Sequence, residues 1–593
     1  MGGFSYCCCQ RVFKYGQHAD YVLEAVGVSA AIASGVALAL VNLVMGQFMN
    51  VLSGASLSEG VPPNFMSEVT KYSWVSYNIT YAGTFFIAVG VFQASPIIMP
   101  CPPHSLLWGH LRLMGETLAK FPPNMYLQAV LTQLKEEHNL PDIWYLDLWP
   151  MGPEFIIVTS PDAAAIPTTV TAFPQCRLVK NHFSTSLGES FIEVTNGKEW
   201  KDLHHMLAPG LTPAAVRSYH DIIIEEAVAL RNRFRRLATS EKVIDFGLEF
   251  GKFPFEVVAR VFFGERIGTQ HDNPGLYARV RSLADILGRK SGPKDPFTAL
   301  RIRFQEWKVI RHLWRDILPY IERRFEALHQ EKVIPNRTTA TNLVDRMLAP
   351  HAQNSQPLSN SAITPIVHNA LGFMAAGFGT TSDTISYAYM LLGAFPETLA
   401  KLREEHDRVF DRSFDKTLEL VRENPALLKD MKYTAAVIHE TLRLFPIGFV
   451  VRDPPPDMKY FEHNNKKYPI KGQAIGICAH TMHFNPEIFP EPTRFNPDRF
   501  TDSNPSYSRH AYRPFERGLR SCLGQNLAME EMKIALLMTA RWFDFELTDH
   551  QVAEGSKFLQ SDLEAILGIH AYQTMSVTAS PRGPVRMKIR ALF

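Results

Sequence analysis

Phe-Glu-Arg-Gly-Leu-Arg-Ser-Cys-Leu-Gly is the sequence from Phe515 to Gly524, and it places Cys522 between two glycines. Glycine adopts positive φ at little cost, so we expect Gly518 and Gly524 to let the backbone curl around the sulfur. A helical pattern follows at once, and the positive end of its dipole would stabilise a thiolate. Arg520 can pair with a carboxylate of a cofactor. The alternative is a buried structural cysteine before a helix.

This ten-residue run matches the haem-binding signature of the cytochrome P450 family at every defining position, and the chain resembles that family. The resemblance implies that Cys522 is the axial ligand of the iron in haem b. A thiolate ligand pushes electron density onto iron and favours cleavage of the O–O bond. The expected function is therefore that of a monooxygenase, which receives electrons from NADPH through a separate NADPH-cytochrome P450 reductase.

Two charged residues three positions apart, Glu440 and Arg443, lie on the same face of an apolar helical pattern. Taken alone, the pair is typical of an ordinary surface ion pair. The resemblance implies more, because a third family position matches Arg499. Together the three residues are expected to form a buried charge network that fixes the region around the cysteine loop, and removal of one member would leave a buried charge unpaired.

The segment Ala-Ala-Gly-Phe-Gly-Thr-Thr, residues 375–381, lies inside a long helical pattern. Two glycines within a helix each cost about 1 kcal/mol relative to alanine, so they need a reason. A groove over a bound cofactor is one reason, and tight packing between helices is the other. The family's oxygen-binding segment matches here with Thr380 at the alcohol position, but Gly379 replaces the usual acid. Proton delivery would then use Asp383, one turn further on, or water above Gly379.

The remaining cofactor contacts are implied by the resemblance alone. The stretch from Trp200 to His205 places His204 where the family commonly has an arginine or lysine that holds a haem propionate. His204 could do so if it is protonated, and a neutral exposed histidine is the alternative. Trp200 fits either case. Arg452 matches a position that commonly contacts the other propionate.

The N-terminal end of the chain predicts a membrane anchor over residues 1–98. No charged residue occurs from Ala25 to Ser58, a run long enough to cross a bilayer of ~30 Å as a helix, and a second uncharged run extends from Tyr72 to Pro103. The flanking basic residues predict cytosolic flanks and a luminal loop, hence an anchor in the endoplasmic reticulum membrane. A cleaved signal peptide is the alternative.

Residues 1–95 also resemble the start of the transmembrane domain in fungal multidrug ABC transporters. No phosphate-binding Gly-x-x-x-x-Gly-Lys-Ser/Thr run occurs, so the ATPase of such a transporter is missing. Residues 1–95 are either a transporter fragment that now serves as a membrane anchor or the product of a gene model that joins two neighbouring genes. The adjacent Cys7, Cys8 and Cys9 do not form a disulfide framework, but they could be palmitoylated.

Residues 99–593 are expected to form one haem-thiolate catalytic domain with a mainly α fold and small β regions. Lys and Arg number 61 against 59 Asp and Glu, so the global charge gives no reason to expect a nucleic-acid partner. The predicted helices and strands lie at 220–237, 304–329, 364–392, 428–445 and 522–545, and at 155–159 and 474–478.

The expected substrate is a lipophilic small molecule, and the resemblance to fungal members suggests secondary metabolism. Polyketides, terpenoids and indole alkaloids all remain open. One alternative is a P450-fold isomerase, dehydratase or reductase that does not use O2, motivated by Gly379. Another is a passive haem domain on a membrane transport or scaffold protein.

Overall fold

The computed structural model describes residues 99–592, except for 106–107, 272, 291–294, 331–338, 353–356, 502–506, 550–561 and 576–577. The predicted anchor, its two membrane spans, the cysteine trio and the transporter-like segment all fall within residues 1–98 and so lie outside the described residues. Within the described ranges, none of the helices combines the length and the apolar character needed to cross a bilayer.

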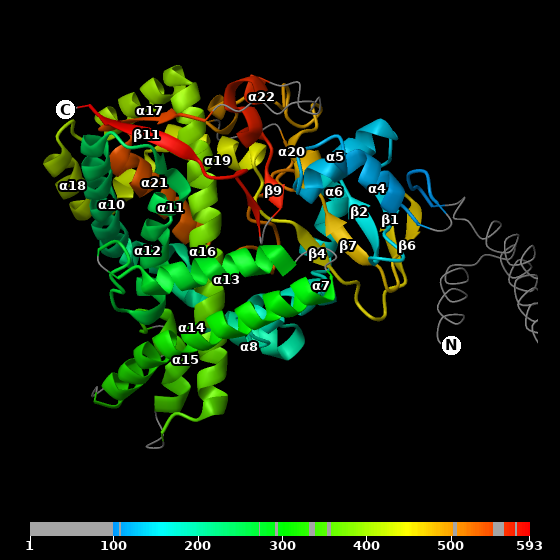
Figure 1. The fold of residues 1–593 in the computed structure, drawn as a ribbon, viewed down its shortest axis with the longest axis horizontal. Helices are drawn as coiled ribbons and strands as arrows, with labels where there is room; N and C mark the ends of the chain where they lie inside the picture. The colour runs from blue at the N-terminus through cyan, green and yellow to red at the C-terminus, as the bar shows by residue number, and fades with distance from the viewer. Residues whose placement is uncertain are drawn as a thin grey trace, which may run out of the picture.

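Helices make up most of the described chain and form the larger part of the body (Figure 1). In the first part of the chain they are α4 (Leu111–Leu118), α5 (Leu127–Glu137), α6 (Pro161–Ala165), α7 (Arg177–Leu187), α8 (Gly197–Leu207), α9 (Pro213–Ser218), α10 (His220–Ser240), α11 (Phe246–Phe250), α12 (Lys252–Phe263), α13 (Gly275–Lys290) and α14 (Pro296–Gln330). They continue with α15 (Leu343–Ala352), α16 (Asn360–Ala394), α17 (Pro396–Val409), α18 (Phe414–Glu423), α19 (Lys432–Leu444), α20 (Ala479–His483), α21 (Gln525–Thr539) and α22 (Asp562–Leu567). Short helical turns of other types are η1 (Ile166–Val170), η2 (Ile192–Val194), η3 (Ala208–Leu211), η4 (Pro425–Lys429), η5 (Pro497–Phe500) and η6 (Gly568–Ala571).

The strands form small sheets, the largest of which has the order β1-β2-β7-β4. Its members are β1 (Ile143–Asp147), β2 (Glu154–Val158), β7 (Ala474–Ile477) and β4 (Val450–Arg452). The other strands are β3 (Ile244–Asp245), β5 (Tyr460–His463), β6 (Lys466–Pro469), β8 (Phe543–Leu547), β9 (Thr574–Met575), β10 (Ala579–Ser580) and β11 (Arg586–Ala591). Because β4 pairs with β7 in the register Arg452↔Ile475, the large sheet fixes the position of Arg452.

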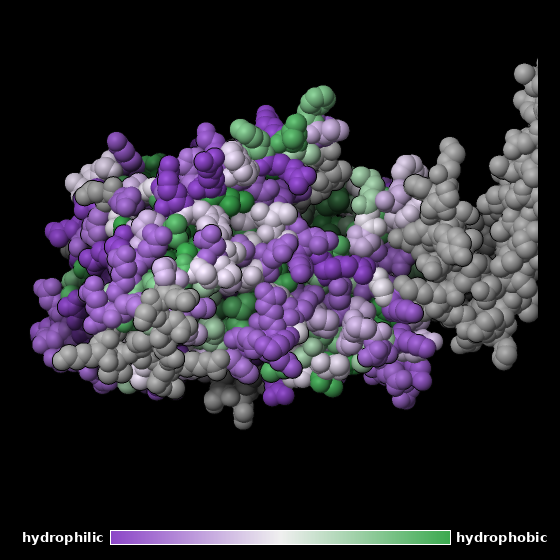
Figure 2. Space-filling model, turned by 90° about the horizontal axis from the view of Figure 1, so that it is seen from below, coloured by the Kyte–Doolittle hydropathy of each residue, from purple (hydrophilic) through white to green (hydrophobic). Residues whose placement is uncertain are grey.

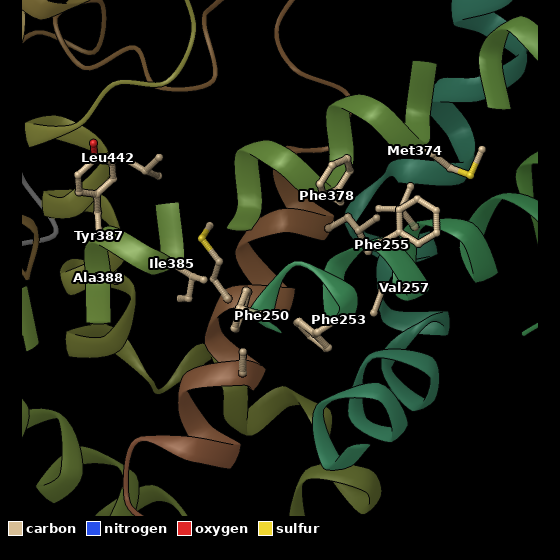
Figure 3. Packing of buried hydrophobic residues seen from close by; sticks show 14 of the residues in the cluster. Phe250, Phe253, Phe255, Val257, Met374, Phe378, Ile385, Tyr387, Ala388 and Leu442 are labelled. Atoms are coloured by element: carbon tan, nitrogen blue, oxygen red, sulfur yellow. The ribbon is translucent and has the colours of Figure 1, made fainter. Parts of the chain in front are cut away.

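The long helix α16 runs through the body and packs against α12, α13, α14 and α19 (Figure 1). Aromatic side chains fill the contact with α12, where the Phe255 and Phe378 rings meet edge to face at 5.9 Å (Figure 3). On one outer face, by contrast, polar residues predominate and apolar residues occur in small separate groups (Figure 2). The mainly helical fold with small sheets confirms the predicted fold class.

The helical pattern predicted to run to Phe545 ends earlier, which corrects that boundary. The helix α21 ends at Thr539, and the strand β8 begins at Phe543. Phe543, Phe545 and Leu547 are buried in alternation, and β8 pairs with β11 along its length. A period of two fits a sheet face, and cross-strand pairing buries the three apolar side chains better than a continued helix would.

Two other predicted helices begin at capping groups rather than at the edge of the apolar pattern. The helix α14 starts eight residues before the predicted 304, because Asp295 accepts the Thr298 amide at 2.9 Å and Pro296 occupies the first turn. The predicted 428–445 helix is divided, and α19 begins at Lys432, where the buried Glu405 accepts the next two backbone amides.

Candidate haem site

The loop before α21 holds Cys522 in a tight curl. The Cys522 amide donates to the Phe515 carbonyl at 2.9 Å, and Gly518 adopts φ +84°. A Cβ atom at Gly518 would lie 1.9 Å from the Thr168 carbonyl oxygen, so only glycine fits there. The expected positive φ at Gly524 is wrong: Gly524 has φ −82° and caps α21, and Glu516 supplies the second left-handed residue.

Two observations describe the surroundings of Cys522. The residue has substantial accessible surface, yet burial raises the pKa of its thiol to about 11. The two observations agree if the accessible surface borders an enclosed volume rather than bulk solvent. The backbone amides of Gly524 and Gln525 lower that pKa and favour the thiolate. A bound metal would supply the remaining stabilisation and keep the sulfur deprotonated.

The segment 375–381 of α16 also borders open space. A Cβ atom at Gly379 would meet no neighbouring atom within 4 Å, and Ala376 is exposed although the helix is largely buried. The Thr380 hydroxyl donates to the Ala376 carbonyl at 2.8 Å. At Gly377, however, a Cβ would lie 2.6 Å from the Val258 side chain on α12. Gly377 therefore serves helix packing, whereas Gly379 leaves room on the open side.

Arg520 and Arg452 form a positive pole, in which Arg452 is buried and Arg520, two residues before Cys522, is half-buried. Arg520 donates to the Thr195 carbonyl at 2.8 Å and to the Asn196 side chain at 2.7 Å, and its guanidinium lies 4.6 Å from the centre of the Trp200 ring. Arg452 is 3% exposed. Burial, and then the charge of Arg452, lower the pKa of Arg520 to about 10, which places the two cations near one another.

His204 stands next to this pole and is neutral at ordinary pH. Its ring lies 4.8 Å from the ring of Trp200, one turn back on α8. Burial is the largest cause that lowers the pKa of His204, and the charges of His205 and Arg520 lower it further. His204 can therefore offer a neutral ring N–H to a carboxylate, and not the positive charge of the arginine or lysine that it replaces.

Asp383 follows Thr380 by three residues on α16 and receives a hydrogen bond from the Ser580 hydroxyl at 2.8 Å. Ser580 lies in β10, near the C-terminal end of the chain. Burial raises the pKa of Asp383 to about 7, although the Ser580 bond and the charge of Arg281 oppose the shift. A carboxyl group with a pKa near neutrality can both give and take a proton.

Glu440, Arg443 and Arg499 lie together in one buried charge network. Glu440 and Arg443 are fully buried and form two parallel hydrogen bonds of 2.7 and 2.8 Å, while Arg499 contacts the same carboxylate at 3.3 Å. Arg443 also donates to the carbonyls of His483 and Pro492 at 2.8 and 2.7 Å. The network thus joins α19 to the chain segments that precede the cysteine loop.

The family model described as "Cytochrome P450" matches residues 100–566 of the chain. The chain belongs to the cytochrome P450 family. Several fungal relatives cover most of the same region. The chain is 27% identical over 460 residues to cytochrome P450 monooxygenase polC of Polytolypa hystricis, covering 75% of this chain and 81% of the relative.

Two other relatives show the same level of similarity. Cytochrome P450 monooxygenase acrF of Aspergillus aculeatus is 27% identical over 502 residues, covering 79% of this chain and 98% of its own length. Cytochrome P450 monooxygenase ptmJ of Penicillium ochrochloron is 26% identical over 455 residues, covering 75% and 84%. The chain is accordingly a P450 monooxygenase enzyme, and its family implies a haem iron cofactor.

The residues of this P450 fit such a cofactor. Haem needs a thiolate for its iron, cations or hydrogen-bond donors for its two carboxylates, and a flat space for its ring. Cys522 has accessible surface, Arg520 and Arg452 would supply the cations, and a Cβ atom at Gly379 would meet no neighbouring atom within 4 Å. The donor set is therefore complete within the described part of the chain.

Three functional candidates in this P450 were not predicted from the sequence: Glu193, Gln175 and Ser580. Glu193 and Gln175 lie close to Arg452, and Ser580 binds Asp383. Each reaches its partner from a distant part of the chain, 197 residues away in the case of Ser580. Information on which distant residues contact one another would be needed to predict these candidates, and a single sequence does not contain it.

Proposed function

We propose that this P450 is a haem-thiolate monooxygenase that inserts one atom of O2 into a lipophilic small molecule, in fungal secondary metabolite biosynthesis. The observation that carries the proposal is the position of Cys522, whose accessible surface lies in the loop that also carries the half-buried Arg520, with the buried Arg452 close to that arginine. The fungal relatives named as monooxygenases support the same reaction class. Polyketides, terpenoids and indole alkaloids are the substrate classes to screen.

The chain would hold haem through a small set of residues. Cys522 would bind the iron, Arg520 and Arg452 would bind the carboxylates, and Trp200 and His204 would complete that edge. When bound, haem supplies oxygen activation, for which a thiolate ligand is well suited. The rest of the work falls to the protein, which must orient a substrate beside Thr380, exclude water and deliver protons.

Asp383 is proposed to deliver those protons in place of the acid that Gly379 replaces. Ser580 occupies Oδ2 of the carboxyl group, which leaves Oδ1 to hold the proton. Thr380 lies three residues back along the helix, near enough in sequence to share that face of α16. Because the pKa of Asp383 is about 7, the protonated form is replenished from solvent at neutral pH.

Replacing Asp383 with asparagine should lower product formation per NADPH oxidised by roughly 100-fold, since a positioned general acid contributes about 10²- to 10⁴-fold. Wild-type product formation should also fall as pH rises through 7, because deprotonation removes the proton donor. The asparagine variant should lack this pH dependence. The measurement is product and hydrogen peroxide per NADPH, with purified reductase and a substrate found by screening.

Two companion variants make this test specific. Asp285→Asn changes an exposed carboxylate on α13 and should behave as wild type. Gly379→Asp combined with Asp383→Asn should recover product formation, because a side chain at residue 379 would extend into open space. An Asp383→Asn enzyme with wild-type coupling would exclude Asp383 as the donor and leave water above Gly379 as the route.

The electrons are proposed to come from NADPH through NADPH-cytochrome P450 reductase at the endoplasmic reticulum, with the catalytic domain (99–593) in the cytosol and residues 1–98 as its anchor. The full chain should remain in the membrane pellet after alkaline carbonate washing, and a chain that lacks residues 1–98 should leave it in larger part. Recovery of the full chain in the wash would contradict the anchor. Transcript sequencing over residues 1–98 tests the alternative of fused genes.

Gly379 also motivates a second candidate, a P450-fold isomerase, dehydratase or reductase that does not use O2. Activity with peroxide or nitric oxide, together with persistent inactivity with NADPH, reductase and O2, would favour this candidate. The presence of a titratable Asp383 one turn from Gly379 favours the monooxygenase.

A further inference from the structure

Glu193 lies in the short turn η2, between α7 and α8, and its side chain contacts the buried side chain of Gln175. Its neighbours Ile192 and Val194 are buried, and the Ile192 amide is tied to Asn369 of α16 at 3.1 Å. Glu193 itself has accessible surface, yet burial is the largest cause that raises the pKa of its carboxyl group. As with Cys522, this combination indicates a side chain that borders the enclosed space.

The contacts of Glu193 place it in the positive pole. Gln175 donates to Glu193 through its side-chain nitrogen. The oxygen of the same amide accepts from Arg452 at 3.1 Å and from the Cys176 amide at 3.2 Å. The amide of Gln175 is therefore fixed in one orientation and bridges Arg452 and Glu193.

Few charged groups act on this carboxyl group. Arg452 and Arg520 lower its pKa, and Glu193 in turn raises the pKa of Cys522. Arg513 and Glu516 act on Arg452 from the cysteine loop. On α7, which packs against η2, the guanidinium of Arg177 binds the Gly472 carbonyl, and His182 is influenced by Lys290 and Glu306. The two arginines are thus the cations that Glu193 shares with any bound anion.

Haem would bring two propionate carboxylates to this pole. Arg452 and Arg520 balance two negative charges, and burial lowers the pKa of His204, which favours its neutral form. An ionised Glu193 would therefore be a third carboxylate for two cations, of which Arg452 is buried and Arg520 half-buried, and an uncompensated charge in such a place is costly. A carboxylic acid at the same position would instead donate a hydrogen bond.

We propose that Glu193 is a further cofactor-contact residue, which is a neutral carboxylic acid in the haem-loaded protein and donates its proton in a hydrogen bond to a haem propionate. The proton comes from solvent and no covalent bond between heavy atoms changes. Haem binding and proton uptake by Glu193 are then coupled. This inference rests on the proposed haem-binding function and adds a titratable residue to it.

The test is the rate of haem transfer from the purified holoprotein to excess apomyoglobin, over a pH series that extends upward from the ordinary pKa of a glutamate to about pH 8.5. In this range Arg520, with its pKa of about 10, stays charged. The wild-type rate should rise with pH as Glu193 ionises, about tenfold for each pKa unit by which haem binding raises the pKa of Glu193, because one pKa unit corresponds to a tenfold change. Glu193→Gln, which is neutral throughout, should keep the slow rate at both ends. Glu199→Gln, an exposed carboxylate on α8, should follow the wild type.

Infrared spectra provide an independent measurement. The haem-loaded wild type should show the C=O stretch of a protonated carboxyl group that is absent from Glu193→Gln. Identical pH profiles in the wild type and Glu193→Gln, with the red-shifted carbon monoxide band intact in both, would overturn the role of Glu193 alone. A wild-type protein without that band would overturn the haem-thiolate function, and this inference with it.

Discussion

The reduced wild-type protein should show a strongly red-shifted Soret band with carbon monoxide, and Cys522→Ala should lose it entirely. The reason is local, since Cys522 has an exposed side chain, whereas Cys176 and Cys478 are buried. Cys176, for example, donates to Asp453 at 3.0 Å. The thiolate alone gives this spectral signature to a haem protein, so the loss does not depend on substrate.

The measurement compares microsomes that contain equal amounts of each variant, with total haem determined separately. Cys478→Ala is the matched control, because Cys478 is fully buried and receives a hydrogen bond from Thr481 at 3.1 Å. That variant should retain the band. A band that persists in Cys522→Ala, or that is missing from folded, haem-loaded wild type, would remove Cys522 as ligand and with it the monooxygenase proposal.

The parts of the site that could be predicted from the sequence are those formed by short contiguous segments, such as the cysteine loop. Gly518 was expected to adopt positive φ because a curl around a sulfur requires it, and it does so at +84°. The same reasoning was wrong for Gly524, since Glu516 supplies the other left-handed residue. Glycine permits a conformation without requiring it, so the pattern could not decide which residue would use it.

The parts that sequence reasoning missed depend on packing between distant segments. Residues 543–545, at the start of β8, were assigned to the preceding helix, because the pairing with β11 that makes them a strand involves a distant part of the chain. Likewise Gln175, Glu193 and Arg452 meet from three separate regions of the chain. The local apolar periodicity of a sequence contains no information on contacts between distant residues. It does indicate helices directly, which is why the mainly helical fold class could be predicted.

The second large effect is expected at Glu440. Replacing it with glutamine keeps the shape of the side chain but leaves Arg443 as a fully buried cation without an anion. Breaking a buried pair in this way costs about 3–5 kcal/mol, a large fraction of the stability of most domains. Arg443 would retain its bonds to the carbonyls of His483 and Pro492, which do not neutralise its charge. The yield of haem-loaded protein should therefore fall steeply.

The variants are compared by thermal melting and by the yield of the carbon monoxide band. Asp202→Asn is the control, because Asp202 pairs with Lys198 on an exposed helix surface and its loss should leave the melting temperature unchanged. The double variant Glu440→Leu with Arg443→Leu should also be less stable than the wild type. It leaves no unpaired charge at these two positions, but the carbonyls of His483 and Pro492 lose the hydrogen bonds that Arg443 donates. Wild-type stability in Glu440→Gln would show that the pair adds nothing to the fold, and stability in the double variant would show that its charge alone mattered.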